Sequence, residues 1–147
     1  MIQRIQTVYL LISALLIASL MKLKLADLSV NEELYTFFAN GIYKGENLVY
    51  NGITILILVW IISLLHIGII FLYKKRIAQL RILVFTMVLL LGLFGLFFFF
   101  SYSGFEGAKA AFKIPVVFPV VAVILDYLAI RAIGKDEALI RSLNRIR

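Results

Sequence analysis

Four long apolar stretches restrict what this chain can fold into more than any other feature of its sequence. They cover residues 5–25, 53–73, 82–102 and 114–133. A helix of about 20 apolar residues can cross the hydrocarbon core of a bilayer, and it pairs its own backbone polar groups, as lipid requires. The pattern therefore predicts an all-α membrane protein built as a four-transmembrane-helix bundle.

The first stretch is the shortest of the four. Its apolar run ends at Met21, and it extends to residue 25 only if Lys22 and Lys24 reach the headgroups with their amines. A signal peptide is the alternative interpretation of such a run. Because Ala18-Ser19-Leu20-Met21 is a poor cleavage site and three more spans follow, an uncleaved membrane anchor is favoured.

Composition supports a single membrane domain over residues 1–147. The chain is 63% hydrophobic, whereas soluble domains are about half apolar. The net charge is +7, but the basic residues gather beside the apolar stretches, which favours anionic lipid headgroups as partners and not nucleic acid. The absence of cysteine excludes disulfides and thiolate metal sites, and a lone histidine excludes a histidine-rich metal site. We therefore expect no metal site, no cofactor and no enzymatic activity.

The sizeable polar segment at residues 26–52 contains a hairpin signal. Leu34-Tyr35-Thr36-Phe37-Phe38 has the composition of a strand, Asn40-Gly41 is a strong two-residue turn signal, and residues 42–44 could form the returning strand. An isolated hairpin is only marginally stable in water. We therefore expect a small extracytoplasmic β-hairpin-like loop that rests on the outer ends of the helices.

The distribution of lysine and arginine predicts the orientation, because cytoplasmic loops are enriched in both. Ten lie on one side: Arg4, Lys74, Lys75, Arg76, Arg81, Arg131, Lys135, Arg141, Arg145 and Arg147. The other five are Lys22, Lys24, Lys44, Lys109 and Lys113. We expect both termini to be cytoplasmic. Headgroup contact is predicted for Lys74, Lys75, Arg76, Arg81, Arg141, Arg145 and Arg147.

Residues 134–147 have the pattern of a C-terminal amphipathic helix. Apolar residues recur at helical spacing at Leu139, Ile140, Leu143 and Ile146, between basic residues. Asp136 and Glu137 fall where a first turn would favour acids. Gly134 could act as a swivel that lets this cytoplasmic tail lie along the inner leaflet. A frayed basic topology signal is the alternative.

His66 and Asp126 are the ionisable residues inside the apolar stretches, where such groups are unfavourable and often functional. Counted from the outer ends of their spans, they lie about 19 and about 18 Å deep at a rise of 1.5 Å per residue. Parallel helices would place them at one level, near Ser63 and Ser13. Three interpretations remain: a packing pair, a proton relay or cation site, or an Asp126 that reaches Arg131 or water near the inner surface.

The two ends of the chain resemble a known family. The segments MIQRIQTVYLLI at 1–12 and LAIRAIGKDEALIRSLNRIR at 128–147 resemble DUF4293, a family of small four-helix membrane proteins from Bacteroidota. The resemblance implies a multi-pass protein of the bacterial inner membrane. It implies no activity, because the function of that family is uncharacterised.

Two classes of function fit these features. The first is a non-enzymatic subunit, or an assembly or regulatory partner, of a larger inner-membrane complex, with the hairpin and the basic tail in contact with a membrane-protein partner or a second copy. The alternative is a small proton-coupled transporter that acts as an oligomer, with Asp126 as its membrane carboxylate. Small multidrug exporters also combine four helices with one such acid, although theirs lies in the first helix. We favour the first class.

Overall fold

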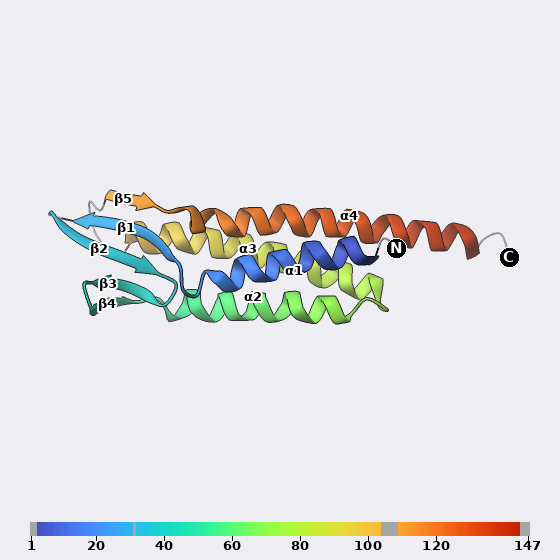
Figure 1. Cartoon of the computed structure of the whole chain (residues 1–147), viewed down its shortest axis with the longest axis horizontal. Helices are drawn as coiled ribbons and strands as arrows, with labels where there is room; N and C mark the ends of the chain where they lie inside the picture. The colour runs from blue at the N-terminus through green and yellow to red at the C-terminus, as the bar shows by residue number, and fades with distance from the viewer. Residues whose placement is uncertain (1–2, 31, 104–108, 145–147) are drawn as a thin grey trace.

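A computed structural model describes residues 3–30, 32–103 and 109–144. The elements in this part of the chain are α1 (Gln3–Ser19), β1 (Lys24–Val30), β2 (Glu33–Phe38), β3 (Gly41–Lys44), β4 (Asn47–Asn51), α2 (Ile53–Phe71), α3 (Arg76–Ser103), β5 (Lys109–Phe112), the 3-10 helix η1 (Ile114–Val117) and α4 (Phe118–Asn144). The helices lie side by side along the long axis, with the strands at one end and α4 projecting past the other helices at the opposite end (Figure 1).

The helices form a bundle in which each packs against two neighbours, in the order α1, α2, α3, α4 and back to α1. In the described part of the chain, α2, α3 and the segment Ile114–Ile140 are long and apolar enough to cross a membrane. Helix α1 has 17 residues and is about 26 Å long, slightly less than the hydrocarbon thickness of about 30 Å. It ends at Ser19, so the first apolar stretch does not continue as helix to residue 25.

Every helix buries a narrow stripe with alternating spacings of four and three residues. In α4 the stripe is Ala122, Asp126, Ala129, Ile133 and Asp136, and in α1 it is Gln6, Leu10, Ser13 and Ile17. This is the spacing of a coiled-coil seam, in which side chains of one helix fit between those of the next. Large apolar side chains such as Ile57, Trp60 and Leu64 lie exposed outside the stripe of α2, and such surface suits contact with lipid.

The prediction of an all-α fold is wrong, because a five-stranded antiparallel sheet covers one end of the bundle. The strand order is β4-β3-β2-β1-β5. Strand β1 includes Leu25, which the hydropathy pattern assigned to a helix. Strand β5, which pairs with β1, comes from the connection between α3 and α4. A chain segment leaves the helical state when strands on both sides can pair its backbone, and β1 pairs with both β2 and β5.

The predicted hairpin is present, but it forms the middle of this larger sheet. Phe38 pairs with Gly41, and Thr36 pairs with Tyr43, so the two-residue turn is Ala39-Asn40, one residue before the predicted Asn40-Gly41. Gly41 has a positive φ of 153°, and a Cβ at this position would lie 2.4 Å from the carbonyl oxygen of Tyr50. Only glycine therefore lets β4 approach β3 this closely.

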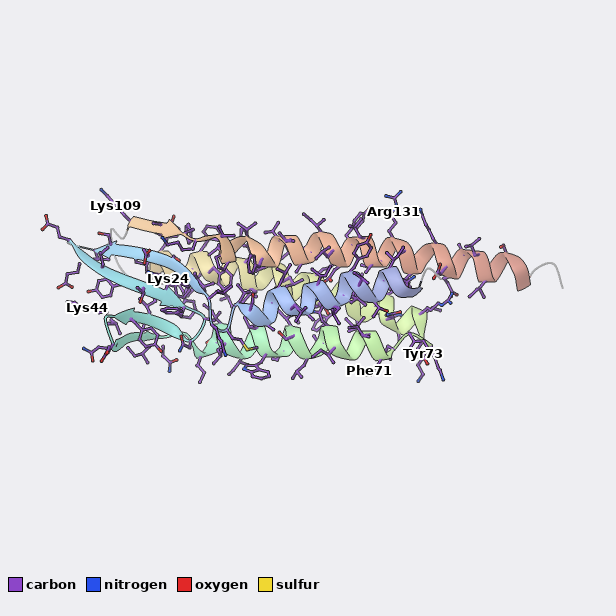
Figure 2. The ribbon with its side chains drawn as sticks, viewed as in Figure 1. Lys24, Lys44, Phe71, Tyr73, Lys109 and Arg131 are labelled. Atoms are coloured by element: carbon purple, nitrogen blue, oxygen red, sulfur yellow. The ribbon has the colours of Figure 1, made fainter. Side chains whose placement is uncertain are left out.

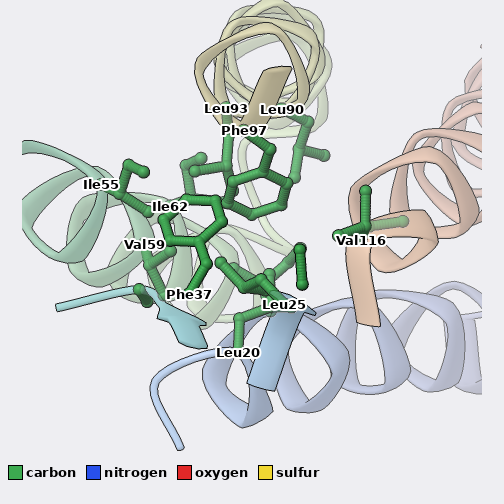
Figure 3. Close-up of a cluster of buried hydrophobic side chains, with 14 of the residues drawn as sticks. Leu20, Leu25, Phe37, Ile55, Val59, Ile62, Leu90, Leu93, Phe97 and Val116 are labelled. Atoms are coloured by element: carbon green, nitrogen blue, oxygen red, sulfur yellow. The ribbon is translucent and has the colours of Figure 1, made fainter. Parts of the chain in front are cut away.

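An apolar cluster joins the sheet to the helices (Figure 3). The ring of Phe37 on β2 packs edge-on against Phe97 of α3, with centroids 6.4 Å apart and planes at 86°. The same cluster contains Leu20, Leu25, Leu28, Ile55, Val59, Ile62, Leu90, Leu93 and Val116. Because these residues come from the sheet and from three helices, the sheet is part of the protein core and not a loose cap.

Asp27 on β1 is an electrostatic link within the sheet. It pairs with Lys24, and its Oδ2 lies 3.0 Å from Nζ of Lys113, which follows β5. The hydrogen bond from Lys24, opposed by desolvation and supported by Lys113, lowers the pKa of Asp27 below its ordinary value of 3.8. Asp27 thus fastens the β5 edge to the centre of the sheet.

We predict that acid weakens the sheet through Asp27. A carboxyl whose pKa is lowered on folding stabilises the protein above its unfolded pKa, and this contribution is lost as pH falls through the folded pKa. The apparent melting temperature should therefore drop as pH falls from about 5 to about 2, and Asp27→Asn should reduce that drop. The contribution is up to about 1 kcal/mol because exposed pairs are screened. Circular dichroism melts measure it, with the exposed Glu46→Gln as control; an unchanged pH profile in Asp27→Asn would contradict the prediction.

Candidate functional site

His66 and Asp126 meet at the centre of the helix bundle. His66 Nε2 lies 3.1 Å from each of the two carboxyl oxygens of Asp126. Both side chains are fully buried, with 0% exposure. His66 belongs to α2 and Asp126 to α4, which are not neighbours in the order of helix packing. The contact therefore crosses the axis of the bundle and ties together two helices that face each other diagonally.

The second ring nitrogen of His66 fixes the protonation pattern of the pair. Nδ1 lies 2.9 Å from the carbonyl oxygen of Ile62, one turn earlier on the same helix. A carbonyl oxygen can only accept, so Nδ1 carries a hydrogen and donates it. Nε2 and the Asp126 carboxyl must then share one proton to form their hydrogen bond. The pair exists either as imidazolium and carboxylate or as imidazole and carboxylic acid.

Both forms of the pair have no net charge, which is what full burial favours, since an isolated buried charge is strongly disfavoured. Removal of the shared proton would leave one negative charge in the bundle, and addition of a second proton would leave one positive charge. The site can therefore hold a single proton between two helices. It can also act simply as a polar fastener.

The neighbouring hydroxyl groups contribute less to this layer than the sequence suggested. Ser63 Oγ donates to the carbonyl of Val59 at 2.8 Å, within its own helix. Ser13 Oγ of α1 donates to the carbonyl of Ala122 at 3.4 Å, one turn before Asp126 on α4. Ser13 therefore adds a weak link between α1 and α4 beside the pair, whereas Ser63 does not bridge helices.

A second buried polar contact was missed by sequence reasoning. Gln6 Nε2 of α1 donates to Asp136 Oδ2 of α4 at 2.9 Å, and these side chains are only 7% and 9% exposed. Asp136 had been assigned to the polar first turn of a separate tail helix. The signal that reveals it is its spacing, because Asp136 continues the buried stripe through Asp126 and Ile133.

The predicted swivel at Gly134 is wrong. Helix α4 continues without interruption from Phe118 to Asn144, and it projects beyond the other helices as a straight extension (Figure 1). The contact between Gln6 and Asp136, beyond Gly134, holds this part of α4 against α1. Leu139 and Ile140 of the extension are exposed, at 56% and 41%.

The predicted basic residues divide between the two ends of the molecule. Lys24, Lys44 and Lys109 lie at the sheet end, and Arg131 lies toward the other end (Figure 2). Lys74, Lys75 and Arg81 are exposed around the connection between α2 and α3. Arg145 and Arg147 lie outside the described residues, as does the side chain of Arg141. The described residues contain no group of three or more His, Cys, Asp or Glu that could hold a metal ion.

We predict different effects for two substitutions of Asp126. Asp126→Asn should fold, because its amide can donate to Nε2 of His66. Asp126→Leu should lower the free energy of unfolding by about 1–3 kcal/mol, since it leaves a buried imidazole nitrogen unpaired. Unfolding by SDS in mixed micelles, followed by fluorescence of Trp60, measures the difference.

The matched control is Ser63→Ala on the same helix, which removes a hydrogen bond within α2 and should change stability little. An Asp126→Leu variant as stable as the wild type would show that the pair does not hold α2 and α4 together.

Comparison with known proteins identifies the family. A family model described as "Domain of unknown function (DUF4293)" matches residues 2–146, which is nearly the whole chain. The chain therefore belongs to this family. Searches of curated proteins and of solved structures give no match.

Proposed function

We propose that this DUF4293 protein is a non-enzymatic integral membrane protein, and that it serves as a small subunit, or an assembly or regulatory partner, of a larger complex in the bacterial inner membrane. The observation that supports a binding role is the outer edge of the sheet. Strand β4 is an edge strand whose five residues are all exposed. Its sequence, Asn47-Leu48-Val49-Tyr50-Asn51, contains neither a charged residue nor proline.

Edge strands of this kind are normally protected by charge, proline or a covering segment, because they invite contact with other chains. The opposite edge follows that rule, since β5 begins with Lys109 and is followed by Lys113. On β4, Leu48 and Val49 are 50% and 46% exposed. The β4 edge of the sheet is therefore apolar and unprotected, whereas the β5 edge is protected by lysines. An exposed apolar surface of this kind is typical of a site that another protein covers.

The geometry of β4 favours contact through side chains over addition of a further strand. Ile42 pairs with Tyr50 and Tyr43 pairs with Leu48, which leaves Val49 as an extra residue in a β-bulge. A bulge interrupts the regular row of backbone groups that an added strand would need. We therefore infer that the partner presents an apolar surface to Leu48 and Val49.

The position of β4 indicates that this partner is itself a membrane protein. Only Gly52 separates β4 from α2, and the Asn51 side chain accepts a hydrogen bond of 3.0 Å from the backbone N–H of Ile53. Because α2 is apolar enough to cross a membrane, β4 would be held directly beside the membrane surface. A protein that contacts it must lie at the same level.

A proton-coupled transporter that acts as an oligomer, with Asp126 as the membrane carboxylate, is the second candidate. The buried contact between His66 Nε2 and the Asp126 carboxyl is the observation that favours it. Because both side chains are fully buried, transport would require another conformation in which the pair meets water. Proteoliposomes with an internal pH dye distinguish the two roles: proton uptake that Asp126→Asn abolishes would favour transport over the subunit role.

We predict that Leu48→Glu weakens association with the partner without unfolding the protein. In the free protein the new carboxylate stays in water, because residue 48 is exposed on an edge strand, so the fold should be unaffected. In the complex the same carboxylate would lose its water against an apolar surface, which is unfavourable. Purification from native membranes in mild detergent should recover a stoichiometric membrane-protein partner with the wild type and much less with the variant. Leu34→Glu, on the central strand β2 and 72% exposed in the wild type, is the control. Equal loss with both variants would exclude β4 as the specific contact.

The orientation is a separate prediction. Reporter fusions after Ala78 and Arg147 should give cytoplasmic signals, and a fusion after Lys44 should give a periplasmic one, because ten of the fifteen lysines and arginines belong to the first side. A periplasmic signal at Ala78 would overturn this topology.

A further inference from the structure

Two open clefts meet at Arg76, the first residue of α3, at the end of the bundle away from the sheet. One has a volume of about 540 Å³ and is lined by Lys74, Lys75, Arg76 and Glu137 among others. The other has a volume of about 600 Å³ and lies beside Val8, Ile70 and Phe71. Both volumes fall in the range of about 300–1,000 Å³ typical of ligand sites. Arg76 and Tyr73 line both clefts.

Arg76 has a buried nitrogen whose hydrogen-bonding capacity is unused. Nη1 is shielded from solvent and makes no hydrogen bond to any described residue. Buried donors on a charged group are strongly disfavoured unless an acceptor pairs with them. The buried polar side chains of Gln6 and Gln79, which also line the second cleft, do have acceptors, namely Asp136 and the carbonyl of Ile69. The described residues therefore supply no acceptor for this guanidinium nitrogen, and Arg76 lies where the two clefts meet.

The charge around the first cleft specifies an anionic acceptor. Lys74, Lys75 and Arg76 provide three positive charges along its wall, against one negative charge from Glu137. The first turn of α3 also lines this cleft and contains no acidic residue. Its free N–H groups and the positive end of the helix dipole favour an anion at the same place. A planar guanidinium suits a phosphate, which it can bind through two parallel hydrogen bonds.

The apolar lining of the second cleft indicates that an apolar group is attached to that phosphate. Val8 and Phe71 are 51% and 76% exposed beside it, and Ile70 completes an apolar wall between α1 and α2. An apolar chain that leaves a phosphate at Arg76 could enter this cleft directly. Free phosphate would leave the apolar wall uncovered, whereas a phospholipid would fill both clefts.

We propose that Arg76 is the centre of a binding site for an anionic phospholipid, with the phosphodiester on the guanidinium and the first turn of α3, and with an acyl chain along Val8, Ile70 and Phe71. A headgroup with an additional positive charge is disfavoured because Lys74 and Lys75 line its cleft. This site is distinct from the β4 surface, so it stands or fails independently of the proposed function.

The experiment is a titration of the delipidated full-length protein in detergent, with native mass spectrometry and thermal melting as readouts. The probes are dioleoylphosphatidylglycerol, dioleoylphosphatidylcholine and inorganic phosphate. We expect the wild type to bind phosphatidylglycerol in preference to the other two. Arg76→Gln should weaken that binding by about 10- to 100-fold, the effect of losing hydrogen bonds to an ionised group.

The control is Arg131→Gln, which removes the same charge from an exposed position on α4 and should leave lipid binding unchanged. Arg76→Lys keeps the positive charge but loses the planar guanidinium that can bind a phosphate through two parallel hydrogen bonds. It should weaken binding by about tenfold. This variant therefore tests the site even if Arg76→Gln fails to fold. Equal weakening in Arg76→Gln and Arg131→Gln would reduce the site to general charge attraction. Binding of phosphatidylcholine as tight as phosphatidylglycerol would overturn the charge preference, and binding of inorganic phosphate as tight as the lipid would overturn the acyl cleft.

Discussion

The hydrogen bond between His66 and Asp126 is the constraint on which the arrangement of the helices depends. Within a bilayer, apolar helices gain little from contact with one another because lipid tails are equally apolar, so polar contacts and close packing select the partners. A buried pair that joins α2 to α4 across the bundle axis fixes the rotation of both helices. Helices α1 and α3 then occupy the two spaces between them, and Gln6 with Asp136 sets the relation of α1 to α4 further along.

The sheet adds a constraint of a different kind at one end. Its strands come from the segment between α1 and α2 and from the segment between α3 and α4. Phe37 inserts from the sheet toward α3, and the backbone N–H of Lys113 donates to the carbonyl of Leu25 at 2.8 Å. Residues 24–30, 33–51 and 109–113 of these two connections are therefore joined to one another and to the helix bundle.

Sequence reasoning recovered the features that depend on local patterns. Long apolar stretches predicted α2, α3 and α4, and Asn40-Gly41 predicted the turn between β2 and β3 to within one residue. A count of residues along two spans placed His66 and Asp126 at equal depth, which left contact between them as one interpretation among others, and the structure brings them together. Strand β1 was missed because it is an inner strand only through β5, about 80 residues later in the chain, and nothing near Leu25 signals that partner. Asp136 was missed because a run of charges resembles a solvated tail, although its spacing from Asp126 matches the buried seam.

The position of β1 between β2 and β5 also has a consequence for the order of events during synthesis. One edge of β1 can pair with β2 as soon as residues 24–38 have emerged, but the other edge must wait for residues 109–112. At roughly 5–20 residues per second, the ribosome needs several seconds to make the intervening chain. During that interval the apolar helices α2 and α3 are made while a strand edge stays open. The nascent protein therefore passes through a stage in which chaperones or neighbouring chains can reach backbone groups that the finished molecule conceals.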